Sequence, residues 1–177
     1  IRTGDGDSVV LGGVGNDDIR TGSGNDRIFG DNGRIRLDAA GNWYELIQST
    51  GFDELLGGDD VMDAGQGNNI VFGGFGADTL SSGAGDDIIF GDNGQIVFAS
   101  GIITLLQTTD AVAQTGGKDN IDAGDGDNIV FAGVGDDTVR TGAGSDLIAG
   151  DNGSITNDSS GAIVENDETP QVWQALH

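Results

Sequence analysis

The stretch from Gly12 to Phe29 reads GGVGNDDIR followed by TGSGNDRIF, which is one nine-residue phrase written twice. In each copy, two glycines flank one variable residue. An Asp follows two positions after the second glycine, and an aliphatic residue follows two positions after that Asp. The pattern is G-x-G-x-D-x-U-x, where U is aliphatic, and such a fixed period indicates a repeat architecture.

The spacing of the phrase suits a turn followed by a short strand. Glycine reaches positive φ and lets backbone carbonyls approach a ligand closely. Calcium prefers six to eight oxygen ligands, and it accepts carboxylates together with backbone carbonyls. A turn that exposes its carbonyls and ends in Asp17 offers both kinds of oxygen. In the triplet Asp18–Arg20, side chains alternate along the strand, so Ile19 is predicted to face inward and its neighbours to face water.

The phrase resembles the calcium-binding nonapeptide of the RTX (repeats-in-toxin) family, in which such repeats form a parallel β-helix. The resemblance covers about two-thirds of the chain and implies an all-β fold, a right-handed parallel β-roll or β-solenoid. It also implies several bound Ca²⁺ ions. RTX-like proteins are typically exported unfolded by a type I system and fold when they meet extracellular calcium.

Two phrases are expected to form one coil, so that alternate phrases stack on the same side. Such a coil buries only one aliphatic side chain per phrase, whereas ordering the backbone costs about 1–2 kcal/mol per residue. We therefore expect metal binding and folding to be one event.

The nine-residue phrases are themselves grouped in a longer repeat. The phrase that starts at Arg2 returns from Asp63 and again from Asp122, which gives units of about 59 residues. We divide the chain into unit 1 (1–60), unit 2 (61–119) and unit 3 (120–177) of one continuous solenoid. Because Ile1 and Arg2 begin in mid-phrase, we expect the chain to be an excerpt of a longer one.

The predicted calcium ligands lie at the Asp of each phrase and in its glycine turn. The strongest candidates come from the second and third phrases of each unit: Asp17, Asp26, Asp78, Asp87, Asp137 and Asp146. Half-phrases with the same D-x-U spacing add Asp60 and Asp119, and the Gly-Asp-Asn-Gly turns add Asp31, Asp92 and Asp151. The turn glycines are Gly12, Gly15, Gly22, Gly24, Gly74, Gly76, Gly83, Gly85, Gly133, Gly135, Gly142 and Gly144.

Other acidic residues have plainer explanations. The first phrase of each unit carries Ser8, Asn69 or Asn128 at the Asp position, which puts full sites there in doubt. Each Gly-Asp-Asn-Gly sequence is equally consistent with a tight turn that has no metal role. Solvated surface is the expected environment of the Asp residues off the D-x-U position: Asp5, Asp7, Asp86, Asp125 and Asp136.

After each Gly-Asp-Asn-Gly turn the pattern changes to period two, which predicts a β-hairpin. The predicted strand pairs are 34–37 with 43–47, 95–98 with 102–106, and 154–157 with 162–165.

The first and third phrases of each unit have apolar outward positions: Val9, Leu11, Phe29, Ile70, Phe72, Ile88, Phe90, Ile129, Phe131, Leu147 and Ala149. Exposed apolar stripes are rare in monomers. We expect the hairpins to cover this face, with Trp43 and Trp173 among the covering side chains; the alternative is that neighbouring repeats or another chain cover it.

Composition excludes several classes of function. The chain of 177 residues has 30 acidic and 7 basic residues and a formal charge of −23, which argues against nucleic acid and anionic membranes as partners. No apolar run is long enough to span a membrane. With no Cys and a single terminal histidine, His177, no nucleophilic triad can be assembled, so we expect no enzymatic activity.

Two functions fit these features. The first is a structural, calcium-stiffened segment of a large secreted surface or matrix protein, such as an adhesin stalk, a surface-layer subunit or a fibre. The second is the calcium-binding secretion module of an RTX toxin or secreted hydrolase. Regular hairpins favour the first function, and the sequences that flank the chain would discriminate between them.

Overall fold

A computed structural model of the protein describes residues 1–50, 57–110, 116–158 and 163–164. These residues form strands and turns and no helix. The described part of the chain accordingly offers no helix with the length and apolarity needed to cross a bilayer.

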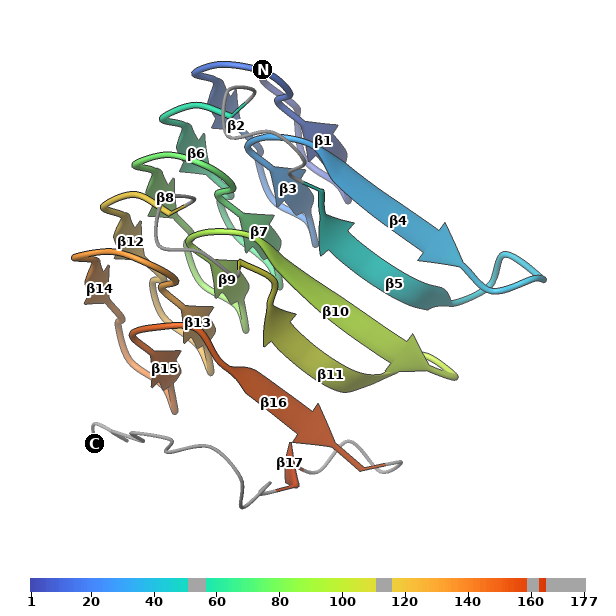
Figure 1. Ribbon diagram of the computed structural model, residues 1–177. Coiled ribbons are helices and arrows are strands. Elements are labelled where there is room, and N and C mark those ends of the chain that lie inside the picture. Colours follow the sequence, from blue (N-terminus) through green and yellow to red (C-terminus); the bar gives the residue numbers. More distant parts are fainter. Residues whose placement is uncertain (51–56, 111–115, 159–162, 165–177) are drawn as a thin grey trace.

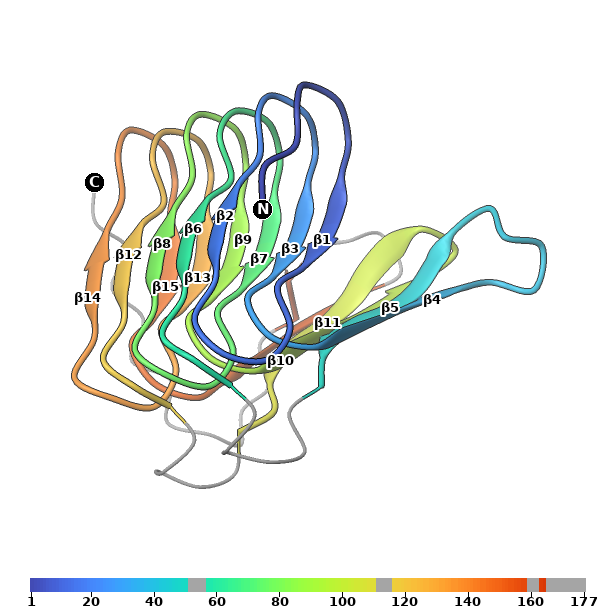
Figure 2. The ribbon, with the colours of Figure 1, turned by 90° about the horizontal axis from the view of Figure 1, so that it is seen from above.

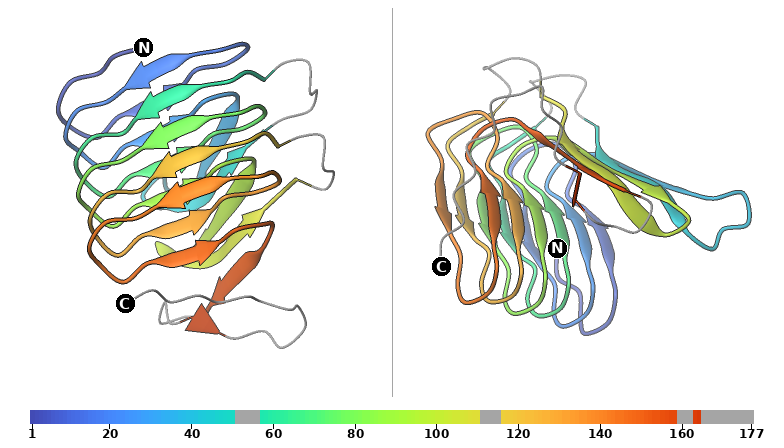
Figure 3. Two further views of the ribbon diagram at one scale, coloured as in Figure 1. Left: turned by 90° about the vertical axis from the view of Figure 1, so that its left-hand side faces the viewer. Right: turned by 90° about the horizontal axis from the view of Figure 1, so that it is seen from below.

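Most of the chain winds between two parallel sheets built from three-residue strands (Figure 1). The sheet that carries the phenylalanines, here the aromatic sheet, contains in order β1 (Val9–Leu11), β3 (Arg27–Phe29), β7 (Ile70–Phe72), β9 (Ile88–Phe90), β13 (Ile129–Phe131) and β15 (Leu147–Ala149). The other, here the polar sheet, contains in order β2 (Asp18–Arg20), β6 (Val61–Asp63), β8 (Thr79–Ser81), β12 (Asn120–Asp122) and β14 (Thr138–Arg140). One strand from each sheet and two turns make one coil, and the coils follow one behind another in Figure 2 and one below another in the left view of Figure 3.

Neighbouring coils keep one register throughout. Equivalent residues of uninterrupted coils are 18 positions apart, as Ser8 and Asp26 are. Where the chain leaves the solenoid and returns, the separation rises to 43 (Asp17 and Asp60) or 41 (Asp78 and Asp119). The strands on either side of each excursion still pair in parallel, for example Ile19 with Met62. The solenoid therefore resumes in the same register after the first and the second excursion.

The core between the two sheets consists of the central residue of each triplet. Ile19 and Ile28 are fully buried, and Val10 is 4% exposed. On the polar sheet the flanking residues Asp18 and Arg20 are exposed, which confirms the predicted alternation. Each strand contributes one central side chain to this interior, as the phrase predicted, and the interior consists mainly of aliphatic residues.

A third sheet, antiparallel and made of the longer strands, lies beside the solenoid (Figures 1 and 2). This cover sheet contains β4 (Gly33–Leu37), β5 (Tyr44–Ser49), β10 (Gly94–Ala99), β11 (Ile102–Thr108), β16 (Ser154–Asn157) and β17 (Ile163–Val164). β4 pairs with β5 and β10 with β11, within one excursion each. β5 also pairs with β10, and β11 with β16, so strands from successive excursions form one continuous sheet.

The cover sheet packs on the aromatic sheet. Phe29, Phe72, Phe90 and Phe131 stack in a column, with neighbouring ring centroids 4.8–5.0 Å apart and ring planes within 5° of parallel. All four are at most 1% exposed, and they share one cluster with cover-sheet side chains such as Ile96. Gly33 and Gly94 make room for this column, because a β-carbon on either would overlap a phenylalanine ring. The prediction that these segments cover the apolar face is thus confirmed, and the alternative that another chain covers these phenylalanines is wrong.

Two details of that prediction need correction. Val9 and Leu11 of β1 stay 54% and 44% exposed, because they lie on the terminal strand of the aromatic sheet. Trp43 is 57% exposed and lies against Gly101, in the turn between β10 and β11, rather than over the phenylalanines. Trp173 lies outside the described residues.

Candidate metal centre

The turns of the solenoid form two rows, one along each side of the stack. Row one joins the aromatic sheet to the polar sheet, and its turns end at Asp17, Asp60, Asp78, Asp119 and Asp137. Row two joins the polar sheet to the aromatic sheet, and its turns end at Ser8, Asp26, Asn69, Asp87, Asn128 and Asp146. The sequence prediction named all eight of these aspartates, and the structure aligns them in two columns.

The row-one aspartates are joined from coil to coil by hydrogen bonds. The backbone N–H of Asp17 donates to Oδ1 of Asp60 at 2.8 Å, and that of Asp60 donates to Oδ1 of Asp78 at 2.8 Å. The series continues from Asp78 to Asp119 at 2.8 Å and from Asp119 to Asp137 at 3.0 Å. One oxygen of every acceptor carboxylate therefore holds the preceding coil.

The second oxygen of these carboxylates has no partner. Oδ2 is buried without a hydrogen bond in each row-one aspartate: Asp17, Asp60, Asp78, Asp119 and Asp137. Buried polar atoms are almost always paired, so a whole column of unpaired oxygens indicates a missing partner such as an ion.

The surroundings of these oxygens suit a cation. Oδ2 of Asp60 faces Gly30, the glycine that opens the same turn, and a β-carbon there would collide with this oxygen and with the carbonyl of Gly73. The same relation holds for Asp78 with Gly73 and for Asp119 with Gly91. Each oxygen thus lies next to a backbone carbonyl, in a space that the β-carbon of any residue other than glycine would fill. Carboxylate and carbonyl oxygens together are the donor set of calcium.

Electrostatics also favour a cation in row one. Burial raises the pKa of Asp78 to about 9, and the charges of Asp119 and Asp60 raise it further. Burial likewise raises the pKa of Asp60 to about 7, with contributions from Asp31 and Asp17, and that of Asp119 to about 7. A column of carboxylates with such raised pKa values needs protons or a counter-cation to remain buried.

Row two has the same ladder but fewer carboxylates. Asp26 donates its N–H to Oδ1 of Asn69 at 3.0 Å, and Asp87 donates to Oδ1 of Asn128 at 3.0 Å. The amide groups of these asparagines bond carbonyls of their own turns, Asn69 to Gly67 and Asn128 to Gly126, at 2.9 and 3.1 Å. The asparagine N–H₂ therefore occupies carbonyls that a cation would otherwise use. Unpaired buried oxygens occur in this row at Asp26 and Asp87, whereas Asp146 is half-buried at the last coil.

The Gly-Asp-Asn-Gly turns place two further carboxylates in row one. Oδ2 of Asp31 accepts the N–H of Phe75 at 2.7 Å, and Oδ2 of Asp92 accepts the N–H of Val134. In both residues Oδ1 is buried without a partner. Burial raises the pKa of Asp31 to about 6 and that of Asp92 to about 8. Asp151, the third residue of this kind, is exposed.

A family model, the RTX calcium-binding nonapeptide repeat, matches four segments of the chain: residues 2–34, 49–71, 63–95 and 115–148. The chain belongs to the RTX calcium-binding repeat family. RTX repeats bind calcium, and the unpaired oxygens of rows one and two fit this ion. Searches of curated proteins and of solved structures found no match.

In this RTX chain, aspartate side chains alone do not enclose an ion. Among the residues that the structure describes, no three histidine, cysteine or acidic side chains converge in a group that could hold a metal. A calcium site here must therefore combine one or two carboxylates with backbone carbonyls, as the turn geometry allows.

The predicted glycine positions are placed in both rows. A φ in the left-handed region is found at Gly15, Gly24, Gly74, Gly76, Gly85, Gly133, Gly135 and Gly144. The prediction included Gly12 but missed its equivalents Gly30, Gly73 and Gly91, which open the row-one turns and face Oδ2 of the closing aspartate. The glycine before each G-x-G was the signal that could have identified Gly73.

The aspartates that were expected to be only solvated have a further role in the RTX turns. Oδ1 of Asp7 accepts the N–H of Asn25 at 2.8 Å, and Oδ1 of Asp86 accepts that of Asp127 at 2.9 Å. Oδ1 of Asp125 accepts the N–H of Ala143 at 2.8 Å. These carboxylates are exposed, yet they form an outer ladder that joins successive turns.

Proposed function

We propose that this chain is an extracellular, structural calcium-binding segment of a large secreted surface or matrix protein, such as an adhesin stalk, a surface-layer subunit or a fibre, and that it folds on binding calcium. The observation that supports it is the set of nine buried aspartate oxygens without a partner in the described residues. A cation at those positions would link each coil to the next.

Charge explains why folding and calcium binding are coupled in this proposal. The chain carries a formal charge of −23, and the coiled fold brings carboxylates into columns. Without a counter-cation this repulsion opposes the compact state. Calcium sites of extracellular modules bind at roughly 10⁻⁴–10⁻³ M, so the chain would stay unfolded where calcium is scarce and fold outside the cell.

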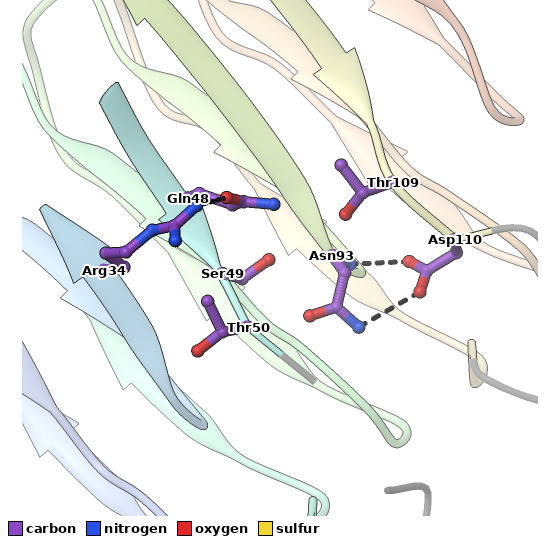
Figure 4. A pocket seen from close by; sticks show the side chains of 7 residues that line it. All are labelled: Arg34, Gln48, Ser49, Thr50, Asn93, Thr109 and Asp110. Carbon is purple, nitrogen blue, oxygen red and sulfur yellow. Dashed lines mark hydrogen bonds between the residues drawn. The ribbon is translucent and has the colours of Figure 1, made fainter. Parts of the chain in front are cut away.

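A structural rather than enzymatic role is supported by how the carboxylates are used. The row-one aspartates are fixed by ladder hydrogen bonds at every coil, as a scaffold requires. A polar cavity of about 400 Å³ lies beside the cover sheet, between residues such as Arg34, Ser49 and Asn93 (Figure 4). Several of its polar side chains are hydrogen-bonded to one another, for example Arg34 to Gln48 at 2.7 Å and Asn93 to Asp110 at 3.1 Å.

Circular dichroism tests the proposal. The chain should show β-structure in millimolar calcium, lose it on addition of a chelator and regain it when calcium is restored. Magnesium at the same concentration serves as the control, because it demands an octahedral site with retained waters and should not replace calcium. Equal spectra with calcium and with chelator would refute the coupling.

A further inference from the structure

Each excursion to the cover sheet is inserted inside a row-one turn. The uninterrupted turns run from Gly12 to Asp17 and from Gly73 to Asp78, and their first and last residues are in contact. In the interrupted turns the same contact joins Gly30 to Asp60 and Gly91 to Asp119. The excursion therefore leaves after the first glycine, and the chain must return to within contact distance before the aspartate can close the turn.

Asp31 and Asp92 lie at the point where the chain departs. Oδ2 of Asp31 lies next to Gly57 of the returning chain, and a β-carbon on Gly57 would be 2.7 Å from it. The same oxygen bonds the N–H of Phe75 in the next coil. Asp92 repeats this arrangement with Gly116 and Val134. Each carboxylate thus touches the departing chain, the returning chain and the next coil.

Hydrogen bonds join the departing and returning chains on the side of the cover sheet. Thr50 donates its N–H to the carbonyl of Asn32 at 2.8 Å, and Thr109 donates to that of Asn93 at 2.9 Å. In the second excursion the backbone N–H and the side-chain amide of Asn93 donate to Asp110 at 2.7 and 3.1 Å (Figure 4).

The row-one side of each junction holds two buried carboxylates, one from the departing chain and one from the returning chain. Asp31 is 3% exposed, Asp60 and Asp92 are each 1% exposed, and Asp119 is fully buried. Each has one oxygen without a partner. The charge of Asp31 acts on Asp60, and the charge of Asp119 acts on Asp92, in the direction of repulsion. Without a cation, these charges would push the departing and returning chains apart.

We propose that a calcium-class divalent cation binds Asp31 together with Asp60, and a second binds Asp92 together with Asp119, so that each cation clamps both ends of one excursion. These clamps extend the calcium binding of the proposed function to carboxylates outside the nonapeptide. In the interrupted turns Asp31 and Asp92 lie next to Gly74 and Gly133, the first glycine of the G-x-G in the following coil, and so supply a second carboxylate to the turn. The two clamps would seat the cover sheet over the phenylalanine column.

The test is a calcium titration of the full chain by calorimetry, with Asp31→Asn, Asp92→Asn and the double variant. Asparagine keeps an oxygen that can accept the N–H of Phe75 or Val134 and removes only the charge. The matched control is Asp86→Asn, an exposed aspartate whose Oδ1 likewise accepts a backbone N–H of the next coil, that of Asp127 at 2.9 Å. Each single variant should bind one ion fewer than the parent chain, the double variant two fewer, and the control the same number.

The calcium dependence of unfolding gives a second readout. The slope of the logarithm of the unfolding constant against the logarithm of calcium concentration counts the ions released on unfolding. A lower midpoint with an unchanged slope and ion count would overturn the clamps and leave Asp31 and Asp92 a structural role. A variant that cannot fold at any calcium concentration would also overturn them, because the hydrogen bond is retained and the other sites remain. If the parent chain takes up no calcium, the proposed function itself fails.

Discussion

Asp78 offers the sharpest test of the calcium-filled ladder, because its two oxygens have separate tasks. Oδ1 accepts the N–H of Asp60 at 2.8 Å, whereas Oδ2 is buried without a partner. Asp78→Asn keeps an acceptor for that N–H and removes the charge. Asp78→Ala removes both. Asn69 and Asn128 already occupy equivalent ladder positions in row two, so asparagine is compatible with the backbone geometry.

The free energies of unfolding of the two variants should differ by the contribution of one buried hydrogen bond. At a calcium concentration of 100 times Kd, one bound ion adds about 2.7 kcal/mol to the free energy of unfolding, and Asp78→Asn should lose about this amount. Asp78→Ala should lose a further 1–3 kcal/mol or so, because the N–H of Asp60 is then buried without an acceptor. The alanine variant should therefore lose about 4–6 kcal/mol in total.

Urea unfolding in calcium, followed by circular dichroism, measures these changes. The control is Asp86→Asn, which alters an exposed outer-ladder residue and should change the free energy of unfolding by less than about 0.5 kcal/mol. If Asp78→Asn is as stable as the parent chain in saturating calcium, Oδ2 of Asp78 does not bind an ion and the interpretation of row one is wrong.

Three further predictions concern protons and packing. Because burial raises the pKa values of Asp60 and Asp119 to about 7 and that of Asp78 to about 9, from 3.8 in the unfolded chain, the metal-free fold binds more protons than the unfolded chain. Its stability should therefore be greatest below about pH 4 and be lost as the pH rises through 7 to 9; a β-sheet signal in metal-free buffer that weakens on acidification would contradict this. Phe90→Ala should cost about 3–5 kcal/mol with no change in calcium stoichiometry, whereas Val9→Ala, at a 54% exposed position, should cost little in the same urea titration. Gly94→Ala should cost roughly 1–3 kcal/mol, because its β-carbon would overlap the ring of Phe90, and Gly153→Ala is the control, since the nearest atom of Phe131 is 3.6 Å away; equal costs would show that the ring contact is unimportant.

Much of the fold could be predicted because the phrase fixes position within the coil. The inward direction of Ile19, the stacking of alternate phrases and the covered face of Phe72 all follow from periods of nine and two. The order of the cover strands could not be predicted, because pairing of β5 with β10 depends on where the coils bring separate excursions together. The exposure of Trp43 likewise depends on the neighbouring turn at Gly101.

The site was predictable for the aspartates and less so for what surrounds them. The D-x-U spacing identified Asp60 although its turn is interrupted. It could not reveal that Gly30 completes that turn, because the two residues are far apart in sequence and meet only after the excursion returns. The difference between the rows also needed the structure, since it arises from side-chain amides of Asn69 and Asn128 that bond their own turns.

The constant offset between coils determines how such a chain would respond to tension. Each coil touches the one before and the one after, so a pull on the two ends would peel coils away singly instead of breaking the whole body at once. Release of an 18-residue coil would lengthen the tether by about 60 Å, and release of a coil that includes an excursion of the 43-residue kind by about 150 Å. If the segment serves as the proposed surface tether, its resistance to extension would vary with the calcium concentration around it.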